Sequence, residues 1–79
     1  MVYVYVLQSV EVSDRHYVGI SDDPLRRLGE HNSGKSIHTN KFKPWKVLVQ
    51  VGFADRNKAA AFEEYLKSGS GRAFAKKHF

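Results

Sequence analysis

The stretch that decides the fold reads VYVYVL and occupies residues 2–7. All six residues are apolar or aromatic, and all but Leu7 are β-branched or aromatic, which is typical of strands. Because successive side chains of a strand point to opposite faces, an uninterrupted apolar run predicts a central strand covered on both sides. Tyr3, Tyr5 and Leu7 would then share one face of the sheet.

A second strand and a first helix are predicted directly after this segment. The sequence HYVGI at residues 16–20 predicts a strand that pairs with the first across a polar turn at residues 9–15. Asp23 followed by Pro24 is a typical helix start, with aspartate as the cap and proline in the first turn. We expect this helix to run to about Asn32.

The second half of the chain repeats the pattern of a strand followed by a helix. After a loop at residues 33–44, the alternating sequence WKVLVQVGF predicts a third strand over residues 45–53, with Trp45, Val47, Val49, Val51 and Phe53 on one face. A helix over residues 56–67 follows, capped by Asp55. The sequence Gly69-Ser70-Gly71 predicts a break, and residues 72–78 a short final helix. The order β-β-α-β-α(-α) predicts an α+β fold with a small, mostly antiparallel sheet.

Length and composition exclude several classes of protein. Seventy-nine residues predict a single domain, residues 1–79, and the absence of cysteine excludes disulfides, thiolate zinc sites and a cysteine nucleophile. No apolar run approaches the roughly 18 residues of a membrane span. We therefore expect a soluble, cytoplasmic protein without a membrane partner.

Positive charge is concentrated in the second half of the chain. Residues 1–40 hold four basic and five acidic side chains, whereas residues 41–79 hold nine and three, for a total net charge of +5. Such a surface attracts nucleic acid, although it is also compatible with simple solvation. The candidate nucleic-acid-binding residues are Lys35, Lys41, Lys43, Lys46, Arg72, Lys76 and Lys77.

Helical phase sorts the charged residues of the first predicted helix. At 100° per residue, Leu25 and Leu28 form its apolar stripe, and Arg27 and His31 lie together along one edge of that stripe. Arg26 and Glu30 fall on the opposite face. The Arg27 side chain should therefore lie along the surface of the sheet, while the Arg26 side chain should point into solvent.

The second predicted helix separates two adjacent glutamates. Its buried stripe contains Ala59, Phe62 and Leu66, with Glu63 at the edge and Glu64 outside. A carboxylate at the edge of a core needs a partner. That partner is either Lys67, four residues later, or a bound ligand. The tyrosines and His31 are equally open to an ordinary role in packing or on the surface.

Taken together, these residues resemble the GIY-YIG nuclease superfamily, in particular its small stand-alone members. The resemblance rests on Tyr3-Val4-Tyr5, on Tyr17-Val18-Gly19 and the segment that follows it, and on Glu63. It implies a three-stranded antiparallel sheet flanked by helices, and a site in which Glu63 is the single acidic ligand of Mg²⁺ or Mn²⁺, with no other small-molecule cofactor. The catalytic residues that it implies are Tyr5, Tyr17, Arg27, His31 and Glu63.

This chain departs from the family pattern at three points. Tyr3 stands where the first motif has glycine, and Ile20 stands where some relatives have lysine after the second motif. A late polar residue of the family has no clear match, with Ser68 and Ser70 as candidates.

The expected activity is metal-dependent hydrolysis of phosphodiester bonds in DNA, rather than RNA, selected by structure more than by sequence, as in repair or recombination. In this chemistry Arg27 binds phosphate oxygens, and Tyr17 or His31 takes a proton from water. Tyr5 orients the water or the phosphate. One alternative is a nucleic-acid-binding module of the same fold that cuts poorly or not at all. Another is a protein-interaction domain.

Overall fold

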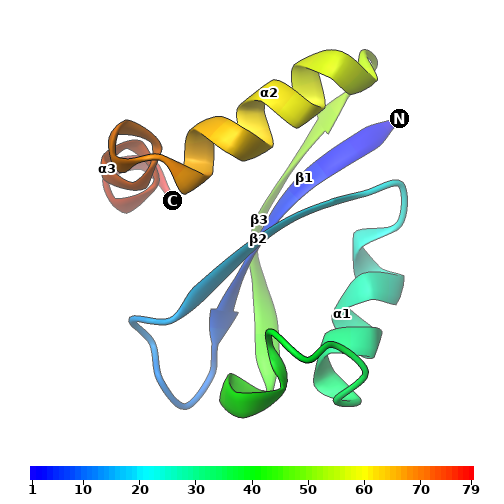
Figure 1. Cartoon of the computed structure of the whole chain (residues 1–79), viewed down its shortest axis with the longest axis vertical. Coiled ribbons are helices and arrows are strands. Elements are labelled where there is room, and N and C mark those ends of the chain that lie inside the picture. Colours follow the sequence, from blue (N-terminus) through cyan, green and yellow to red (C-terminus); the bar gives the residue numbers. More distant parts are fainter.

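The computed structural model describes all residues, 1–79, and arranges them as a three-stranded sheet with helices on both faces (Figure 1). The elements in chain order are β1 (Val2–Ser9), β2 (His16–Ser21), α1 (Pro24–Asn32), the 3₁₀ turn η1 (Asn40–Phe42), β3 (Trp45–Phe53), α2 (Arg56–Lys67) and α3 (Gly69–His78). None of the helices has the length and apolar character needed to cross a membrane.

β1 is the central strand, as its sequence predicts. The sheet order is β2-β1-β3, and β1 pairs antiparallel with both neighbours. Val6, for example, lies opposite Val18 of β2 and Val49 of β3. The predicted α+β fold with a small antiparallel sheet is therefore confirmed, and the predicted strands and helices match closely.

The alternation of β1 divides the interior into two cores. Val2, Val4 and Val6 pack against Ala59 and Leu66 of α2 on one face. On the other face, Tyr5 and Leu7 pack with Trp45, and Leu28 of α1 joins this second cluster. Because both faces of β1 are covered, the side chains that neighbour the site come from elements far apart in the sequence.

The face predicted for β3 is wrong in its first half. The register shifts between Val6 and Leu7, so that Val6 faces Val49 while Leu7 faces Val47. This irregularity places one extra residue in β3, and an extra residue reverses the face of everything before it. Trp45 and Val47 consequently join the core on the α1 side, whereas Val49 and Phe53 join the core on the α2 side.

The stripe predicted for α1 is also wrong at Leu25. Asp23 caps the helix as expected, by accepting a hydrogen bond from the Arg26 amide at 3.2 Å. However, Leu25 is 71% exposed, and the residues that face the sheet are Pro24, Leu28 and His31. The side of this helix that carries His31, and not the side that carries Leu25, faces the sheet. His31 has hydrogen-bond partners there, which removes the usual cost of burying an imidazole.

The predicted break at Gly69-Ser70-Gly71 is a helix boundary one residue earlier. Ser68 ends α2 and also caps α3, its hydroxyl accepting a hydrogen bond from the Gly71 amide at 3.1 Å. The glycines form the first turn of α3 instead of a linker. Gly71 is buried against α2, and a Cβ atom there would lie 1.7 Å from the carbonyl oxygen of Tyr65.

The junction between α2 and α3 gives a first testable prediction. Gly71→Ala should destabilise the protein by more than about 3 kcal/mol, because the clash is with backbone that cannot rotate away. Gly69→Ala is the matched control, since nothing lies within 4 Å of its added Cβ atom. It should be neutral or stabilise the chain by up to about 1 kcal/mol. Urea unfolding of both variants checks this, and equal effects would contradict the observed packing of α3 on α2.

Candidate active site

Three elements bring Tyr5, Tyr17 and His31 into one aromatic cluster on the α1 side of the sheet. The ring centroids of Tyr17 and His31 lie 4.8 Å apart, and those of Tyr5 and Tyr17 lie 6.5 Å apart. Gly19 of β2 faces Tyr5 of β1 across the sheet, and a Cβ atom at Gly19 would lie 2.4 Å from the Tyr5 ring. The glycine of the second motif thus makes room for the tyrosine of the first.

His31 is fully buried and holds the Tyr5 hydroxyl in place. Its Nε2 atom lies 3.2 Å from the Tyr5 hydroxyl and its Nδ1 atom lies 2.7 Å from the Thr39 hydroxyl. Thr39 is itself buried, and its carbonyl oxygen accepts a 2.8 Å hydrogen bond from the Trp45 indole. Both ring nitrogens are therefore occupied, and the ring has no exposed surface.

This burial bears on the role expected of His31. The His31 ring has no exposed surface and both of its nitrogens are occupied, so it is not open to a water molecule in solvent, as a base that takes a proton directly from that water would have to be. Trp45 is 4% exposed and belongs to the core, whereas Phe42 is partly exposed.

Arg27 is fixed between Tyr5 and Glu30. It forms an ion pair with Glu30 three residues later in α1, and Glu30 also pairs with Arg26 at 2.8 Å. Contact with the Tyr5 hydroxyl is the main reason that the pKa of Arg27 is raised, and Glu30 adds to the effect. The Arg27 side chain is 33% exposed and that of Arg26 is 56% exposed. The predicted difference between the two arginines is present, but Glu30 joins them instead of lying on a separate face.

The two motif tyrosines lie in different environments. Tyr5 is 1% exposed, and burial raises its pKa even though the neighbouring Arg27 acts in the opposite direction. Tyr5 is therefore a neutral phenol that donates or accepts hydrogen bonds. Tyr17 is only half-buried, which makes it the tyrosine that an incoming substrate can reach.

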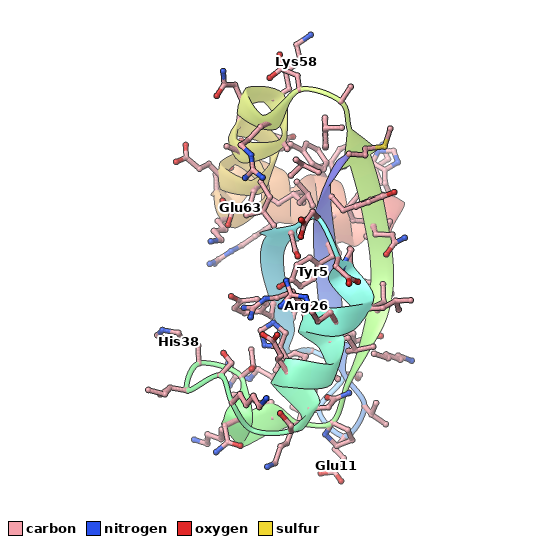
Figure 2. All side chains as sticks on the ribbon, turned by 90° about the vertical axis from the view of Figure 1, so that its right-hand side faces the viewer. Tyr5, Glu11, Arg26, His38, Lys58 and Glu63 are labelled. Carbon is pink, nitrogen blue, oxygen red and sulfur yellow. The ribbon has the colours of Figure 1, made fainter.

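On α2, Glu63 differs from Glu64 as helical phase predicts. Glu64 is exposed, whereas the Glu63 side chain is 17% exposed and its Oε2 atom lies 2.7 Å from the Lys67 ammonium. This contact is the main reason that the pKa of Lys67 is raised, and the Lys67 charge is also close enough to interact with Tyr17. Glu63 thus approaches the tyrosine cluster through Lys67. Figure 2 shows Glu63 on α2 and Tyr5 on the neighbouring central strand.

The comparison with known families decides the identity of the fold. The family described as the GIY-YIG catalytic domain matches residues 1–77. This chain belongs to the GIY-YIG family. The match spans β1 and β2, the strands that contribute Tyr5 and Tyr17.

Individual relatives extend the family match to named proteins. The chain is 35% identical over 65 residues to the structure-specific endonuclease subunit SLX1 homolog of Giardia intestinalis, and 39% identical over 71 residues to SLX1 of Candida dubliniensis. It is 39% identical over 66 residues to a UPF0213 protein of Streptococcus pneumoniae. These alignments cover 77%, 81% and 82% of this chain, but only 18%, 25% and 65% of the respective relatives.

In this GIY-YIG chain, the single carboxylate of Glu63 fits a hydrated divalent metal. No group of three histidine, cysteine or acidic side chains is present, so a site closed by protein ligands alone is not available. Mg²⁺ commonly binds through one or two carboxylates, with water and phosphate completing its shell. Glu63 is largely shielded from solvent and already accepts a cation, the Lys67 ammonium, at one oxygen. Its environment is therefore suited to a positive charge.

The predicted nucleic-acid-binding residues are all exposed and form two groups. The first group lies around η1 and the start of β3, and the second on α3, at different ends of the molecule (Figure 1). Arg15 adds to the first group, because Arg15 and Lys41 lie over the ring of Phe42, at 5.0 and 5.6 Å from its centroid. Ser68 and Ser70, the candidates for a late polar residue, lie at the start of α3, where Ser68 serves as a cap.

Sequence reasoning missed two residues of the site. Thr39 lies in a polar loop and gives no signal of burial, since only the tertiary fold places it on His31. Glu30 could have been found, because it follows Arg27 by three residues, which is a normal spacing for a helical ion pair.

The buried histidine makes stability depend on pH. Burial, helped by the positive charge of Arg27, lowers the pKa of His31 in the folded state, while the unfolded side chain titrates near about 6.5. Below that pH, His31 binds a proton in the unfolded chain but stays neutral in the folded chain. The free energy of unfolding should therefore fall as the pH falls. Urea unfolding between pH 7.5 and 5.5 measures this slope.

Two variants isolate the contribution of His31. His31→Gln should flatten the pH slope, whereas His38→Gln, on an exposed loop, should retain it. Thr39→Val, which leaves the Nδ1 atom of His31 without its partner, should cost about 1–3 kcal/mol, and Thr39→Ser should recover most of that loss. An unchanged slope in His31→Gln would contradict the network described here.

Proposed function

We propose that this GIY-YIG domain is a metal-dependent endonuclease that hydrolyses phosphodiester bonds in DNA and selects its substrate by structure. The observation that carries the proposal is the placing of the candidate residues around Tyr17. The Tyr5 and Tyr17 rings lie 6.5 Å apart, and the Tyr5 hydroxyl is close enough to Arg27 to raise its pKa. Tyr17 lines one pocket with Lys67, which forms an ion pair with Glu63. A cation suited to phosphate, an accessible phenol and a shielded carboxylate thus belong to one region of the molecule. These are the groups that hydrolysis of a phosphodiester needs.

Arg27 would bind the phosphate and stabilise charge that develops on it. Its planar guanidinium can donate two parallel hydrogen bonds to phosphate oxygens. Glu30 and Tyr5 restrict its position before the substrate arrives, so little ordering is left for the reaction itself. The Thr39–His31–Tyr5 network then serves catalysis indirectly, by fixing the hydroxyl that Arg27 contacts.

Tyr17 would take the proton of the attacking water. It is the accessible member of the tyrosine pair, and Tyr5 and His31 are enclosed. Glu63, with water molecules and a substrate phosphate, would hold Mg²⁺ or Mn²⁺. The bound metal would polarise the phosphate and neutralise part of its charge.

The names of the relatives support a structured DNA substrate. Two of them are named structure-specific endonuclease subunits, and the net charge of +5 favours a polyanion. A branched, flapped or nicked DNA accordingly fits better than a defined sequence. The alternative of a binding module without activity is less favoured, because Tyr17, Arg27 and Glu63 are all present.

Arg27 and Arg26 form a matched pair for testing the phosphate-binding role. Arg27→Ala should lower the cleavage rate by roughly 10²–10³-fold, the usual effect of removing one preorganised donor. Arg26→Ala should stay within a few-fold of the parent, since its side chain is mostly solvated. The assay is nicking and flap cleavage in Mg²⁺ or Mn²⁺. Equal losses would remove Arg27 from its assigned role.

Glu63 and Glu64 test the metal site. Glu63→Gln keeps the shape but removes the charge, so cleavage should fall by at least about 100-fold, while Glu64→Gln should cut like the parent. Metal binding has its own readout, because a ligand that binds only the folded state raises the melting temperature. Mg²⁺ or Mn²⁺ should therefore stabilise the parent and Glu64→Gln but not Glu63→Gln.

Circular dichroism should show that both glutamine variants fold. If Glu63→Gln retains metal-dependent cleavage near the parental rate, the metal site lies elsewhere. If the parent binds nucleic acid but cleaves no DNA under these conditions, the alternative of a binding module replaces the nuclease.

A further inference from the structure

The buried chain of side chains Thr39–His31–Tyr5 has one proton more than it has hydrogen bonds. Each hydroxyl carries one proton, and a neutral imidazole carries one proton on one of its two nitrogens. Three protons are therefore available for two contacts, that of Thr39 with His31 Nδ1 at 2.7 Å and that of His31 Nε2 with Tyr5 at 3.2 Å. The surplus proton lies at one end of the chain, either on the Thr39 hydroxyl or on the Tyr5 hydroxyl.

The Thr39 end of this chain is closed. Thr39 is 1% exposed, and His31 is the only hydrogen-bond partner of its hydroxyl. A surplus proton there would lie in the core without an acceptor, which is costly and uncommon in folded proteins. The Thr39 hydroxyl therefore donates to Nδ1, and the His31 proton lies on Nε2. The distances agree, because 2.7 Å is typical of a hydroxyl donor and 3.2 Å lies at the long end for an N–H donor.

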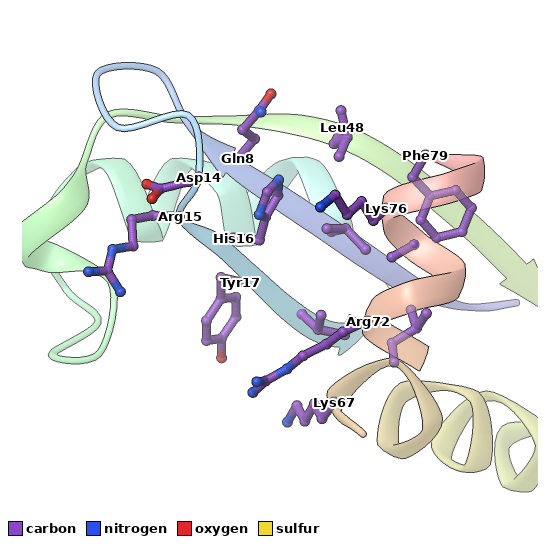
Figure 3. Close-up of a pocket in the computed structure, with 14 residues that line it drawn as sticks. Gln8, Asp14, Arg15, His16, Tyr17, Leu48, Lys67, Arg72, Lys76 and Phe79 are labelled. Carbon is purple, nitrogen blue, oxygen red and sulfur yellow. The ribbon is translucent and has the colours of Figure 1, made fainter. Parts of the chain in front are cut away.

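The Tyr5 end belongs to the candidate active site. The Tyr5 oxygen contacts the His31 imidazole and the Arg27 guanidinium, and in this arrangement both are donors. No group of the protein then accepts the Tyr5 proton. Tyr5 itself is 1% exposed, but the Arg27 side chain that it contacts is 33% exposed. The neighbouring Tyr17 lines the pocket between α3 and the β1–β2 hairpin (Figure 3). A ligand bound by Arg27 beside Tyr17 supplies the missing acceptor.

We infer that Thr39 is a positioning residue, which fixes the proton of His31 on Nε2 and so makes the Tyr5 hydroxyl a hydrogen-bond donor to the phosphate that Arg27 binds. This inference rests on the proposed function, and it gives Tyr5 a role other than that of a base. Hydrogen bonds that point the same way along a chain strengthen one another. Donation from Thr39 therefore makes the Tyr5 proton a better donor, and Tyr5 and Arg27 bind one phosphate group together.

The tautomer of His31 is the first measurement, and it needs no change in the network. In the full chain with ¹⁵N-labelled histidine, long-range ¹H–¹⁵N correlation spectra distinguish a proton on Nε2 from a proton on Nδ1. The His31→Gln variant identifies the His31 signals by their loss. The parent should carry the proton on Nε2. A proton on Nδ1 would overturn the inference, whether or not the chain cleaves DNA.

Thr39→Val and Thr39→Ser test whether Thr39 selects this tautomer. Valine has the shape of threonine without its donor, so the preference for the Nε2 proton should weaken. Cleavage of DNA in Mg²⁺ or Mn²⁺ should slow by about two- to tenfold in kcat, the usual effect of one lost hydrogen bond. Serine should restore both the tautomer and the rate. A merely structural role of Thr39 would change stability but not the tautomer, so an unchanged tautomer in Thr39→Val contradicts the inference.

Binding of inorganic phosphate tests the donor role of Tyr5 without cleavage. The dissociation constant is measured from amide chemical shifts during a phosphate titration. Tyr5→Phe should weaken binding by about two- to tenfold, as expected for one lost donor. Tyr3→Phe is the matched control, since Tyr3 lies on the same strand outside the aromatic cluster, and it should bind phosphate like the parent. Equal affinities of Tyr5→Phe and the parent would remove Tyr5 as the donor.

These measurements separate the inference from the proposed function. If the proton lies on Nε2 and phosphate binding depends on Tyr5, but no DNA is cleaved, the donor network stands and the nuclease does not. If Glu63-dependent cleavage is found, but the proton lies on Nδ1 or Tyr5→Phe binds phosphate like the parent, the nuclease stands and the network has no such role.

Discussion

β1 must send alternate side chains into two different cores, and the rest of the structure follows from that constraint. Its valines are buried by α2, while Tyr5 and Leu7 are buried on the α1 side. A shift of one residue in register would exchange these two sets and bury the wrong side chains on both faces. The packing of the entire sheet therefore fixes the position of Tyr5. His31, which contacts the Tyr5 hydroxyl, is held in place by the same packing.

Rigidity around Tyr5 depends on a polar network enclosed in an apolar core. His31 accepts this position only because Tyr5 and Thr39 occupy both of its nitrogens, and unpaired polar groups in such a place are expensive. The network connects β1, α1 and the loop before β3, three segments that are separate in the sequence. It holds the Tyr5 hydroxyl in one position, and a hydrogen-bonded network of this kind can fix a polar group in a small domain that has no large core.

The charged side chains near the tyrosines form ion pairs, and further basic side chains lie on the outer surface. Glu63 is neutralised by Lys67, and Glu30 by Arg26 and Arg27, so the acidic groups near the tyrosines are all paired. The excess positive charge lies on α3 and around η1. A polyanion would be attracted to these outer positions first, whereas Glu63 is a shielded carboxylate that already accepts one cation, the Lys67 ammonium.

The sequence by itself determined the element order, the central position of β1 and the difference between Glu63 and Glu64, because these depend on local periodicity and capping. It also gave the resemblance to the GIY-YIG nucleases through short motifs. Only the tertiary structure decided which way α1 turns, which residues of β3 face which core, and that His31 is enclosed. Each of these depends on a partner distant in the chain. Thr39 binds the enclosed His31, and Leu7 lies opposite Val47. The burial of His31 leaves Leu25 on the exposed side of α1. Periodicity describes the two sides of an element, but packing free energy summed over the whole fold selects the side that is buried.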